Sequence, residues 1–453
     1  MVKKVKRRKR KLKKTIKILL FTLLLIIITI TIMALIPKKY EKQEPQEEPK
    51  RTASEIITNI LTYNLEESIN DEFLTWINTK YGISTLEKLE SILKENAYNK
   101  NIWHQITSNS LIVLKDEYNN VTSNRIKNLT PKQLNNEITL SFIGDVSLAD
   151  DWYIMPKYDE RGKKVYGILS EEVVRIMTSS DIMVANNEFT ISNRGSKMPN
   201  KYYTFRGKPE RLNIYKEMGV NLVTLANNHI YDYGKTAFND AIDALNEYDI
   251  PYIGAGKNIE EAKEPFYYII NGYKIGFVNA TRAEKYILTP EATETSGGVL
   301  RCYDPTTFLK VIEETKKNSD FVIALVHWGK EDSSELEQVQ LDTSKKYIEA
   351  GADLIVGTHA HTLQGIDFYN NKAIVYNIGD FIFNHETKDT GIFQLKIDND
   401  GNFKYYFLPC KQKDKYTSLL TDVEMTRVLN KMRNLSPNIT ITETGEFYQN
   451  NTN

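Results

Sequence analysis

Residues 321–329 read Phe-Val-Ile-Ala-Leu-Val-His-Trp-Gly, and residues 354–361 read Leu-Ile-Val-Gly-Thr-His-Ala-His. In both stretches a short apolar run rich in β-branched residues leads directly into polar side chains. Such a run is typical of a buried strand, and the histidines then lie at or just beyond its carboxyl end. The two stretches therefore predict a sheet whose strand ends carry imidazoles.

The same pattern recurs from Ile138 to Cys410. Strands are predicted at 138–144, 182–185, 220–225, 274–280, 321–326, 354–357 and 373–377, with amphipathic helices at 211–218, 235–247, 305–317 and 335–350. This alternation of strands and helices predicts an α/β domain. In such domains the functional residues lie beyond the carboxyl ends of the strands, because loops held by a rigid sheet converge there.

Five polar clusters follow five of these predicted strands. They are Gly144-Asp145-Val146-Ser147, Asn186-Asn187-Glu188, Asn227-Asn228-His229 with Asp232, His327-Trp328-Gly329 with Glu331, and Gly357-Thr358-His359-Ala360-His361 with Gln364. Each has a simpler explanation by itself, because an Asp at a strand end can cap a helix and Asn-Asn can form a turn. Four of the six histidines of the chain fall in these clusters, however, which favours a shared site.

The residue types predict a metal centre. In an extended segment, the spacing of His359 and His361 points both imidazoles the same way. Carboxylates combined with several imidazoles and no thiolate suit Zn, Mn or Fe, and a pair of ions needs a shared carboxylate. We therefore expect divalent transition metal ions, two in number. Cys302 and Cys410 are the only cysteines, and their spacing leaves open whether they pair or are separate core residues.

The N-terminal segment predicts a membrane anchor. Eleven Lys and Arg and no acidic residue lie within residues 1–17, and nineteen uncharged residues follow at 18–36. A run of about 20 apolar residues crosses a bilayer, and the absence of a convincing small-residue cleavage site favours an uncleaved transmembrane helix over a signal peptide. The basic segment should remain cytoplasmic. The charged linker at 37–51 and everything after it should be extracellular, as in a single-pass protein of the cell membrane.

The rest of the chain is acidic. Removing the eleven basic residues from the total of 59 leaves 48 Lys and Arg against 59 Asp and Glu. This balance excludes nucleic acid as a partner, because nucleic-acid phosphates require a basic surface. Residues 52–137 have apolar residues at helical spacing and predict a small helical region, followed by the α/β domain at 138–410. Residues 411–453 predict a C-terminal helical segment and a loose tail.

The motifs resemble one known family. Their order is Gly-Asp at 144–145, Asn-x-Glu at 186–188, Asn-Asn-His-x-x-Asp-x-Gly at 227–234, His-Trp-Gly-x-Glu at 327–331, His-x-His-x-x-Gln at 359–364 and Gly-x-Phe-x-Phe at 379–383. This order resembles the CapA family of poly-γ-glutamate capsule proteins, from about Ile138 to Cys410. The resemblance implies a metallophosphoesterase-like four-layer α/β/β/α sandwich with a dinuclear metal centre. It also implies a membrane protein whose partners are an anionic cell-envelope polymer and the membrane-bound synthase of that polymer.

The resemblance assigns the metal ligands motif by motif. One ion would be held by Asp145 and His361, the other by Asn228, His327 and His359, and Glu188 would bridge the two.

The resemblance also implies the groups that act on substrate. His229 would be the acid–base residue and Asp232 would orient it. Arg206 and Gln364 are expected to contact substrate, although a solvated surface position explains Arg206 equally well.

Two departures from the usual patterns bear on the metals. Ser147 stands where phosphoesterases carry a histidine, and Asp380 stands where the family usually has Asn. The loss of an imidazole should weaken the first ion or favour a single ion. The leading function is a metal-dependent hydrolase or transferase in poly-γ-glutamate capsule synthesis or export. A non-catalytic assembly or export accessory and an extracellular metallophosphatase are the alternatives.

The predicted topology is directly testable. Because the basic segment should hold the N-terminus inside, protease added to intact cells should release a large C-terminal fragment. Immunoblotting with an antibody against the α/β domain measures the release, and complete protection of the chain in intact cells would contradict this topology.

Overall fold

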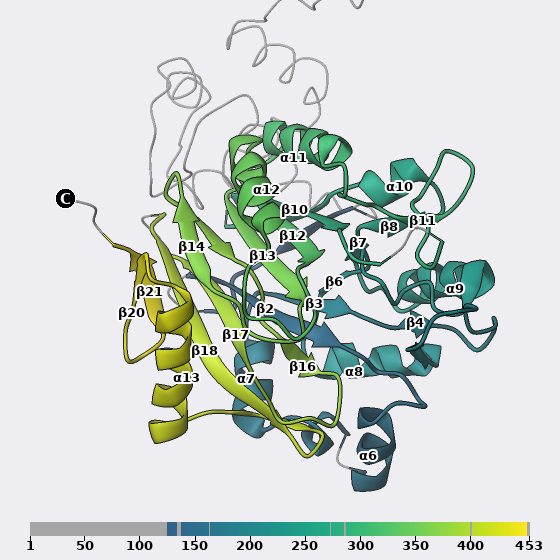
Figure 1. Ribbon diagram of the computed structural model, residues 1–453, viewed down its shortest axis with the longest axis horizontal. Coiled ribbons are helices and arrows are strands. Elements are labelled where there is room, and N and C mark those ends of the chain that lie inside the picture. Colours follow the sequence, from purple (N-terminus) through teal and green to yellow (C-terminus); the bar gives the residue numbers. More distant parts are fainter. Residues whose placement is uncertain are drawn as a thin grey trace, which may run out of the picture. The chain divides into compact units, whose positions relative to one another are not determined.

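The computed structural model describes residues 125–450, apart from 134–136, 163, 272, 285–286 and 399–400. The predicted segments 1–17, 18–36 and 37–51, and the predicted helical region up to residue 124, lie outside the described residues. None of the helices that are described is both long enough and apolar enough to cross a bilayer. Two large mixed sheets dominate the described part of the chain (Figure 1).

The first sheet has parallel strands at its centre. Its order is β1 (Ile126–Leu129), β9 (Phe266–Ile270), β10 (Tyr273–Thr281), β12 (Phe321–Trp328), β13 (Leu354–His359), β15 (Lys372–Val375) and β14 (Ile366–Tyr369). β10, β12, β13 and β15 run parallel, so their carboxyl ends meet at one edge.

The second sheet combines a parallel half with an antiparallel half. Its order is β20 (Ile439–Ile441), β21 (Glu446–Gln449), β18 (Phe403–Lys413), β17 (Lys388–Ile397), β2 (Ile138–Val146), β3 (Ile182–Asn187), β6 (Leu222–Thr224) and β7 (Tyr252–Ile253). β16 (Asp380–Ile382) pairs with β2, and β19 (Tyr416–Leu419) pairs with β18. β2, β3, β6 and β7 are parallel, so their carboxyl ends also converge.

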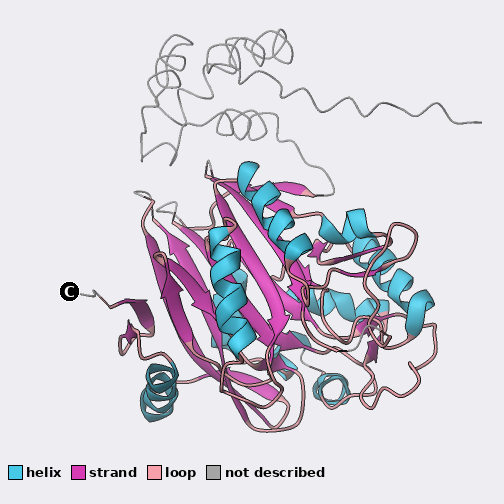
Figure 2. Ribbon diagram, turned by 45° about the horizontal axis from the view of Figure 1, so that its top comes forward, coloured by secondary structure: helices cyan, strands magenta, loops and turns pink. Residues whose placement is uncertain are grey.

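Helices cover the outer faces of both sheets (Figure 2). The second sheet is covered by α7 (Glu171–Ser179), α8 (Leu212–Glu217) and α9 (Gly234–Glu247), and the first by α11 (Thr306–Lys317) and α12 (Gln338–Glu349). The remaining helices are α6 (Ile154–Arg161), α10 (Ile259–Lys263) and α13 (Asp422–Leu435), with short 3-10 turns at Lys164–Gly167 and Pro209–Arg211. Two small ladders join β4 (Thr190–Ile191) to β5 (Arg206–Gly207) and β8 (Ala255–Gly256) to β11 (Gly298–Val299).

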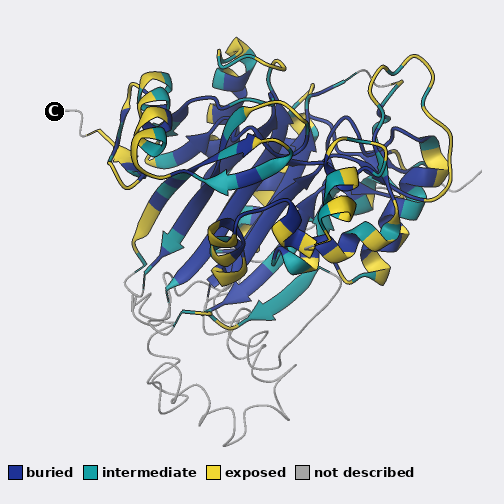
Figure 3. Ribbon diagram, turned by 90° about the horizontal axis from the view of Figure 1, so that it is seen from below, coloured by how far each residue is buried: buried dark blue, intermediate teal, exposed yellow. Residues whose placement is uncertain are grey.

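The strand sequences explain the layers. Along β12, Phe321, Ile323 and Leu325 enter the core between the sheets, whereas the alternate residues pack against α11 and α12. Side chains of a strand alternate between its faces, so a strand buried on both sides must be apolar throughout. Figure 3 shows most strand residues buried, with exposed positions mainly on helices and loops. The predicted α/β class is thereby confirmed, and two sheets that pack on each other with helices on their outer faces agree with the expected four layers.

Two predicted boundaries were wrong. The sheet already includes β1, which pairs with β9 inside the region predicted to be helical. Residues 411–450 contain the predicted helix, α13, but no loose tail, because β18 continues to Lys413 and β19, β20 and β21 join the sheet. Ile439, Ile441 and Phe447 are buried in the core between the sheets. Their alternation extends over too few residues to stand out as a strand pattern in the sequence.

The two cysteines are separate core residues. Cys302 is buried beside α11 and Cys410 is buried in the core that covers the second sheet, and both are free.

A close approach of two glycines aligns the ends of β2 and β16. A Cβ atom on Gly144 would lie 1.7 Å from the carbonyl oxygen of Gly379. That oxygen accepts a hydrogen bond from the Asp145 amide at 3.1 Å, and Asp145 pairs with Asp380 in the ladder. The missing side chain at residue 144 is therefore what allows two carboxylates to lie side by side.

Gly144→Ala should destabilise the domain, because the methyl group forces the two segments apart. We expect the free energy of unfolding to fall by about 1–3 kcal/mol, the usual cost of overpacking. Urea unfolding of the full chain measures this change. Gly167→Ala is a matched control, since its Cβ would meet nothing closer than 3.3 Å, and an equal loss in both variants would contradict the explanation.

Candidate metal centre

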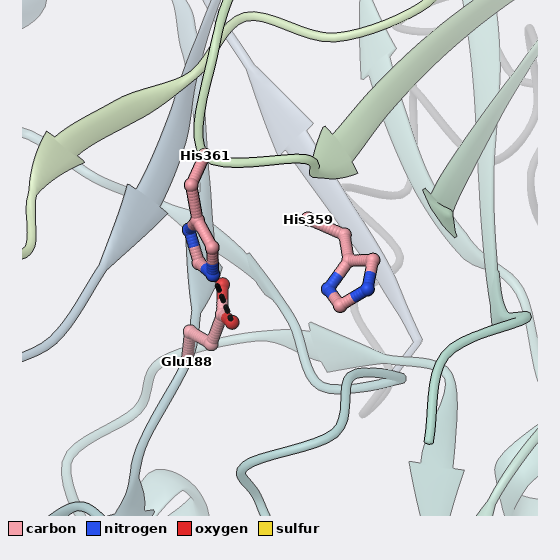
Figure 4. Close-up of side chains that lie close together, drawn as sticks. All are labelled: Glu188, His359 and His361. Atoms are coloured by element: carbon pink, nitrogen blue, oxygen red, sulfur yellow. Dashed lines mark ion pairs between the residues drawn. The ribbon is translucent and has the colours of Figure 1, made fainter. Parts of the chain in front are cut away.

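Polar side chains meet where the parallel halves of the two sheets end. Asp145 lies at the end of β2, Glu188 follows β3, His327 lies in β12, and His359 ends β13. All four are buried, with exposures of 0 to 6%. Figure 4 shows Glu188 facing His361, with His359 beside them. Four clusters predicted from separate strands are thus brought together in space.

Asn186 organises the two central carboxylates. Its Nδ2 donates to Asp145 Oδ1 at 2.8 Å and to Glu188 Oε2 at 2.9 Å. Its own carbonyl oxygen accepts from Thr224 Oγ1 and Asn227 Nδ2, which fixes the orientation of the amide. Asn186 belongs to a sequence motif, but the motif does not predict this role, because a carboxamide between two carboxylates is visible only in three dimensions.

Three imidazoles converge on one oxygen of Glu188. The Nε2 atoms of His229, His327 and His361 lie 4.0, 3.8 and 3.9 Å from Glu188 Oε1. These separations are too long for hydrogen bonds, and they leave space between the rings and Glu188 Oε1 in which an ion could be held. Glu188 Oε1 is buried and accepts no hydrogen bond from any described residue.

The electrostatics around Glu188 call for a cation. Burial, together with the charge of Asp145, raises the pKa of Glu188 well above its ordinary value. Burial acts to raise the pKa of Asp145 as well, but the hydrogen bond and charge of His361 outweigh burial and lower that pKa. A divalent cation would remove the repulsion between the two carboxylates and stabilise both as anions.

The two histidines of the His-x-His motif converge for a reason that differs from the prediction. His359 has φ 97° and His361 has φ 53°, so neither is in an extended conformation. Their ring centroids are 6.0 Å apart. The left-handed backbone turns the chain sharply at the end of β13, and unfavourable conformations of this kind for non-glycine residues cluster at functional sites. The expectation of an extended segment was wrong, although the pairing of the rings in one site is confirmed.

Asp380 is a site residue that the sequence did not identify. Its Oδ1 is 2.7 Å from His361 Nδ1, and Asp145 Oδ2 is 3.2 Å from the same nitrogen. Burial acts to lower the pKa of His361, but the charge of Asp380 and its hydrogen bonds with both carboxylates raise it well above the usual value. The only sequence signal was the departure from the usual Asn, which changes an amide into a charged partner for His361.

His327 and His359 form the other side of the cluster. His327 Nε2 is 2.8 Å from Asn228 Oδ1, and its Nδ1 is 2.9 Å from Thr358 Oγ1. Burial and the nearby His359 lower the pKa of His327 well below its ordinary value, and burial followed by the charge of His361 lowers the pKa of His359 to about 3. His359 Nδ1 is buried with no hydrogen-bond partner among the described residues. Both rings are therefore held neutral, the form that binds metal.

His229 is held by a buried relay. Its Nδ1 is 2.7 Å from Asp232 Oδ2, whose other oxygen pairs with Lys201 Nζ at 2.7 Å. The Lys201 side chain is only 3% exposed. Burial lowers the pKa of His229, which favours the neutral ring. The predicted orientation of His229 by Asp232 agrees with this geometry, and Lys201 is an additional partner that the sequence did not suggest.

The two predicted substrate contacts are engaged elsewhere. The Arg206 guanidinium stacks on Tyr233 at 4.2 Å and donates to the carbonyl oxygen of Arg194. Gln364 is fully buried: its Oε1 accepts from Gln340, and its Nε2 donates to the carbonyl oxygen of Ser333. Gln364 therefore fixes the loop after β12, and neither side chain lines the pocket beside the cluster. Glutamine at this position satisfies backbone carbonyls of a buried turn, a role that the motif could not reveal.

Ser147 is buried at the end of β2. Its hydroxyl has no hydrogen-bond partner among the described residues. The imidazole usual in phosphoesterases is therefore replaced by a small group, while the carboxylate of Asp380 adds a donor on the same side of the site.

The donor set fits divalent metal ions. Three groups of side chains have ligand atoms within 4.8 Å of one another: Glu188 with His359 and His361; Asp145 with Glu188 and His327; and Asp145 with His361 and Asp380. The unpartnered, buried Glu188 Oε1 and His359 Nδ1 are the groups that would otherwise remain unsatisfied. Oxygen and imidazole donors without thiolate match Zn, Mn or Fe.

A pocket of about 200 Å³ opens onto this cluster. His229 and His361 line it, so the cluster can be reached through the pocket. We call it the mouth pocket. Its other lining residues are Trp152, Tyr153, Tyr203, Phe205, Glu331, Asp332, Phe383, Asn384, His385, Glu386 and Lys388.

A family model described as the bacterial capsule synthesis protein PGA_cap matches residues 139–385. The chain belongs to this family. The matched region includes the whole cluster from Asp145 to Asp380, and it confirms the resemblance inferred from the motifs.

Two curated relatives carry the same family name. The capsule biosynthesis protein CapA of Bacillus anthracis is 30% identical over 279 residues, which cover 59% of this chain and 66% of that protein. The PGA biosynthesis protein CapA of Bacillus subtilis is 28% identical over 279 residues, covering 60% and 71%. The chain thus spans slightly less than two thirds of the first relative. A 5'-nucleotidase from Candida albicans aligns at 10% identity with a TM-score of 0.34, over 64% of this chain and 52% of that protein, a similarity too weak to extend the comparison.

Metal should stabilise the PGA_cap domain through Glu188. Adding Mn²⁺ or Zn²⁺ to chelator-treated full chain should raise its melting temperature, because a ligand of the folded state stabilises it by about 2.7 kcal/mol at a hundred times its Kd. Glu188→Gln should abolish most of this rise, since an amide lacks the charge that cations require. Glu210→Gln is the control for an exposed carboxylate. An undiminished rise in Glu188→Gln would show that the ions bind elsewhere.

Proposed function

We propose that this chain is a membrane-anchored protein of capsule synthesis or export, with a metal-dependent hydrolase site that acts on an extracellular anionic polymer such as poly-γ-glutamate. The observation that carries the proposal is the convergence of three imidazoles on the unpartnered oxygen of Glu188, at the base of a pocket. A purely structural cluster would satisfy its buried polar atoms within the protein.

Membership in the PGA_cap family and the names of its relatives support the polymer as the substrate class. The basic segment and the uncharged run at 18–36 support the anchor, with the N-terminus in the cytoplasm. Because this anchor would hold the protein in the membrane, we expect its partners to be membrane-bound subunits of a polymer synthase.

The family resemblance divides the ligands between two ions: Asp145 and His361 would serve one, Asn228, His327 and His359 the other, and Glu188 both. Asp380 lies with Asp145 and His361 and would add a donor there, and Asn228 Oδ1 lies 2.8 Å from His327 Nε2. Divalent ions, when bound, polarise the group under attack and provide a nucleophilic water at neutral pH. The protein's own contribution is to hold these donors rigidly: Asn186 fixes the spacing of Asp145 and Glu188.

Proton transfer is assigned to His229. Its Nδ1–H donates to Asp232, which leaves the Nε2 lone pair directed toward the cluster. The lowered pKa keeps the ring neutral, so Nε2 can accept a proton and later return it to a leaving group. Lys201 holds Asp232 in place, and the Phe205 ring packs at a tilt against the imidazole with centroids 4.4 Å apart.

His229→Ala should separate catalysis from metal binding. We expect turnover to fall by about 10²- to 10⁴-fold, the usual contribution of acid–base catalysis. Metal content should stay near that of the parent, because the other donors remain. Elemental analysis and hydrolysis of bis(p-nitrophenyl) phosphate and poly-γ-glutamate by the full chain provide the two readouts.

Asp232→Asn is the companion variant, since it keeps the size of the side chain but removes the charge that holds the Nδ1 proton. It should lose turnover while retaining metal. A metal-loaded parent that hydrolyses neither substrate would contradict the hydrolase and favour a non-catalytic accessory. Loss of metal in His229→Ala equal to that in Glu188→Gln would show that His229 is a ligand.

A further inference from the structure

The side chains that line the mouth pocket differ from those expected of a site that binds a polyanion. Five of its lining residues are aromatic: Trp152, Tyr153, Tyr203, Phe205 and Phe383. They form a continuous array, with ring centroids 4.5 Å apart for Trp152 and Tyr153, 4.7 Å for Trp152 and Phe205, and 5.5 Å for Phe205 and Phe383. The array runs from exposed Tyr203 to the His229 ring at the cluster.

The charged groups of the mouth pocket are predominantly acidic. Glu331, Asp332 and Glu386 line it together with one lysine, Lys388. Lys388 Nζ lies 2.5 Å from Asp332 and 3.2 Å from Glu386, so two of these carboxylates already engage it. Glu331 is exposed and pairs with no cationic side chain among the described residues. The lining carries a net negative charge, which repels carboxylate groups of a substrate and attracts cations.

Aromatic faces combined with carboxylates form a recognised type of cation site. A positive charge over the face of Trp or Tyr is attracted by the negative face of the ring, and alkylammonium groups are bound in this way. Because this inference concerns the substrate of the site described above, it rests on the proposed function. We propose that the mouth pocket binds an alkylammonium group of the substrate, beside the metal-binding cluster.

Two sources would supply this chemistry. One is the free amino end of a γ-linked glutamate chain, where an ammonium adjoins the anionic polymer. The other is an ester of a cationic alcohol, whose anionic part would face the cluster. Both place an ammonium against the aromatic array and an anion toward the site that binds cations.

The test is a binding measurement that does not depend on turnover. Calorimetric titration of the full chain with choline and with 3,3-dimethyl-1-butanol compares a cation with a neutral group of the same shape. Choline should bind about tenfold more tightly, a difference within the range of cation–π interactions. Equal affinities, or no binding of choline, would overturn the proposal. Repeating the titration with a chelator measures choline binding independently of metal and of hydrolysis. If choline binds but the protein hydrolyses no substrate, the proposed hydrolase function is contradicted and the proposed alkylammonium site is not.

Matched variants locate the site. Tyr203→Ala and Glu331→Gln should each weaken choline binding several-fold, while Tyr203→Phe, which keeps an aromatic face, should retain it. Tyr448→Ala is the control, because Tyr448 is 51% exposed and does not line the mouth pocket. Choline binding that survives both Tyr203→Ala and Glu331→Gln would place the cation elsewhere and overturn the proposal.

A second pair of ligands identifies the source of the ammonium. Tri-γ-glutamate with a free amine and its N-acetylated form differ only at the amino end. Tighter binding of the free amine would support the polymer end as the occupant. Equal binding of the two, with the preference for choline intact, would support an ester of a cationic alcohol.

Discussion

The amide nitrogen of Asn186 lies between two buried carboxylates, and the rest of the site depends on that contact. By donating to both Asp145 and Glu188, it holds two anionic groups side by side at a depth where neither reaches water. A neutral donor cannot cancel their repulsion; it can only fix their spacing. The compensating positive charge has to come from other groups, and His361 supplies part of it through Asp145 and Asp380.

The buried carboxylates find enough hydrogen-bond donors only at the ends of the strands. β2 and β3 bring Asp145 and Asn186 into register, and β12 and β13 bring His327 opposite Thr358. Within the apolar core between the sheets, the same carboxylates would have no donors to satisfy them. At the strand ends, backbone amides and neighbouring side chains are free to act as donors. The close contact of Gly144 with Gly379 then adds Asp380 to the group.

The sequence was informative where a feature is local and failed where it depends on the third dimension. Apolar runs such as 321–326 are read correctly because burial on both faces dictates their composition. The ligand clusters were recognisable because each lies directly after a strand. The short strand at Ile439–Ile441 was missed, since three residues are too few to establish a period. The hydrogen bond from Gln364 to the carbonyl oxygen of Ser333 was not predicted, because a glutamine in a motif looks the same whether it faces substrate or a buried carbonyl.

The left-handed turn at His359 and His361 is a second feature that the sequence pattern could not predict. Alternation along an extended strand would have placed both rings on one face, and the structure achieves a common site by a different backbone path. Asp380 was likewise noted only as an unusual residue, because its partner His361 is nineteen positions away in sequence.

Charge changes sign along the depth of the site, and this gradient constrains what can enter. The cluster at the base collects anionic and neutral donors that require cations, and once these are bound the base attracts an anion. The mouth pocket above it carries Glu331, Asp332 and Glu386, and these carboxylates repel an anion. The interior of a polyanion would have to pass carboxylates through the acidic pocket to reach the base. Under the proposed function, a chain end that pairs an anion with an ammonium would meet both layers with the complementary charge, and attack near an end of the polymer would be favoured over attack in its middle.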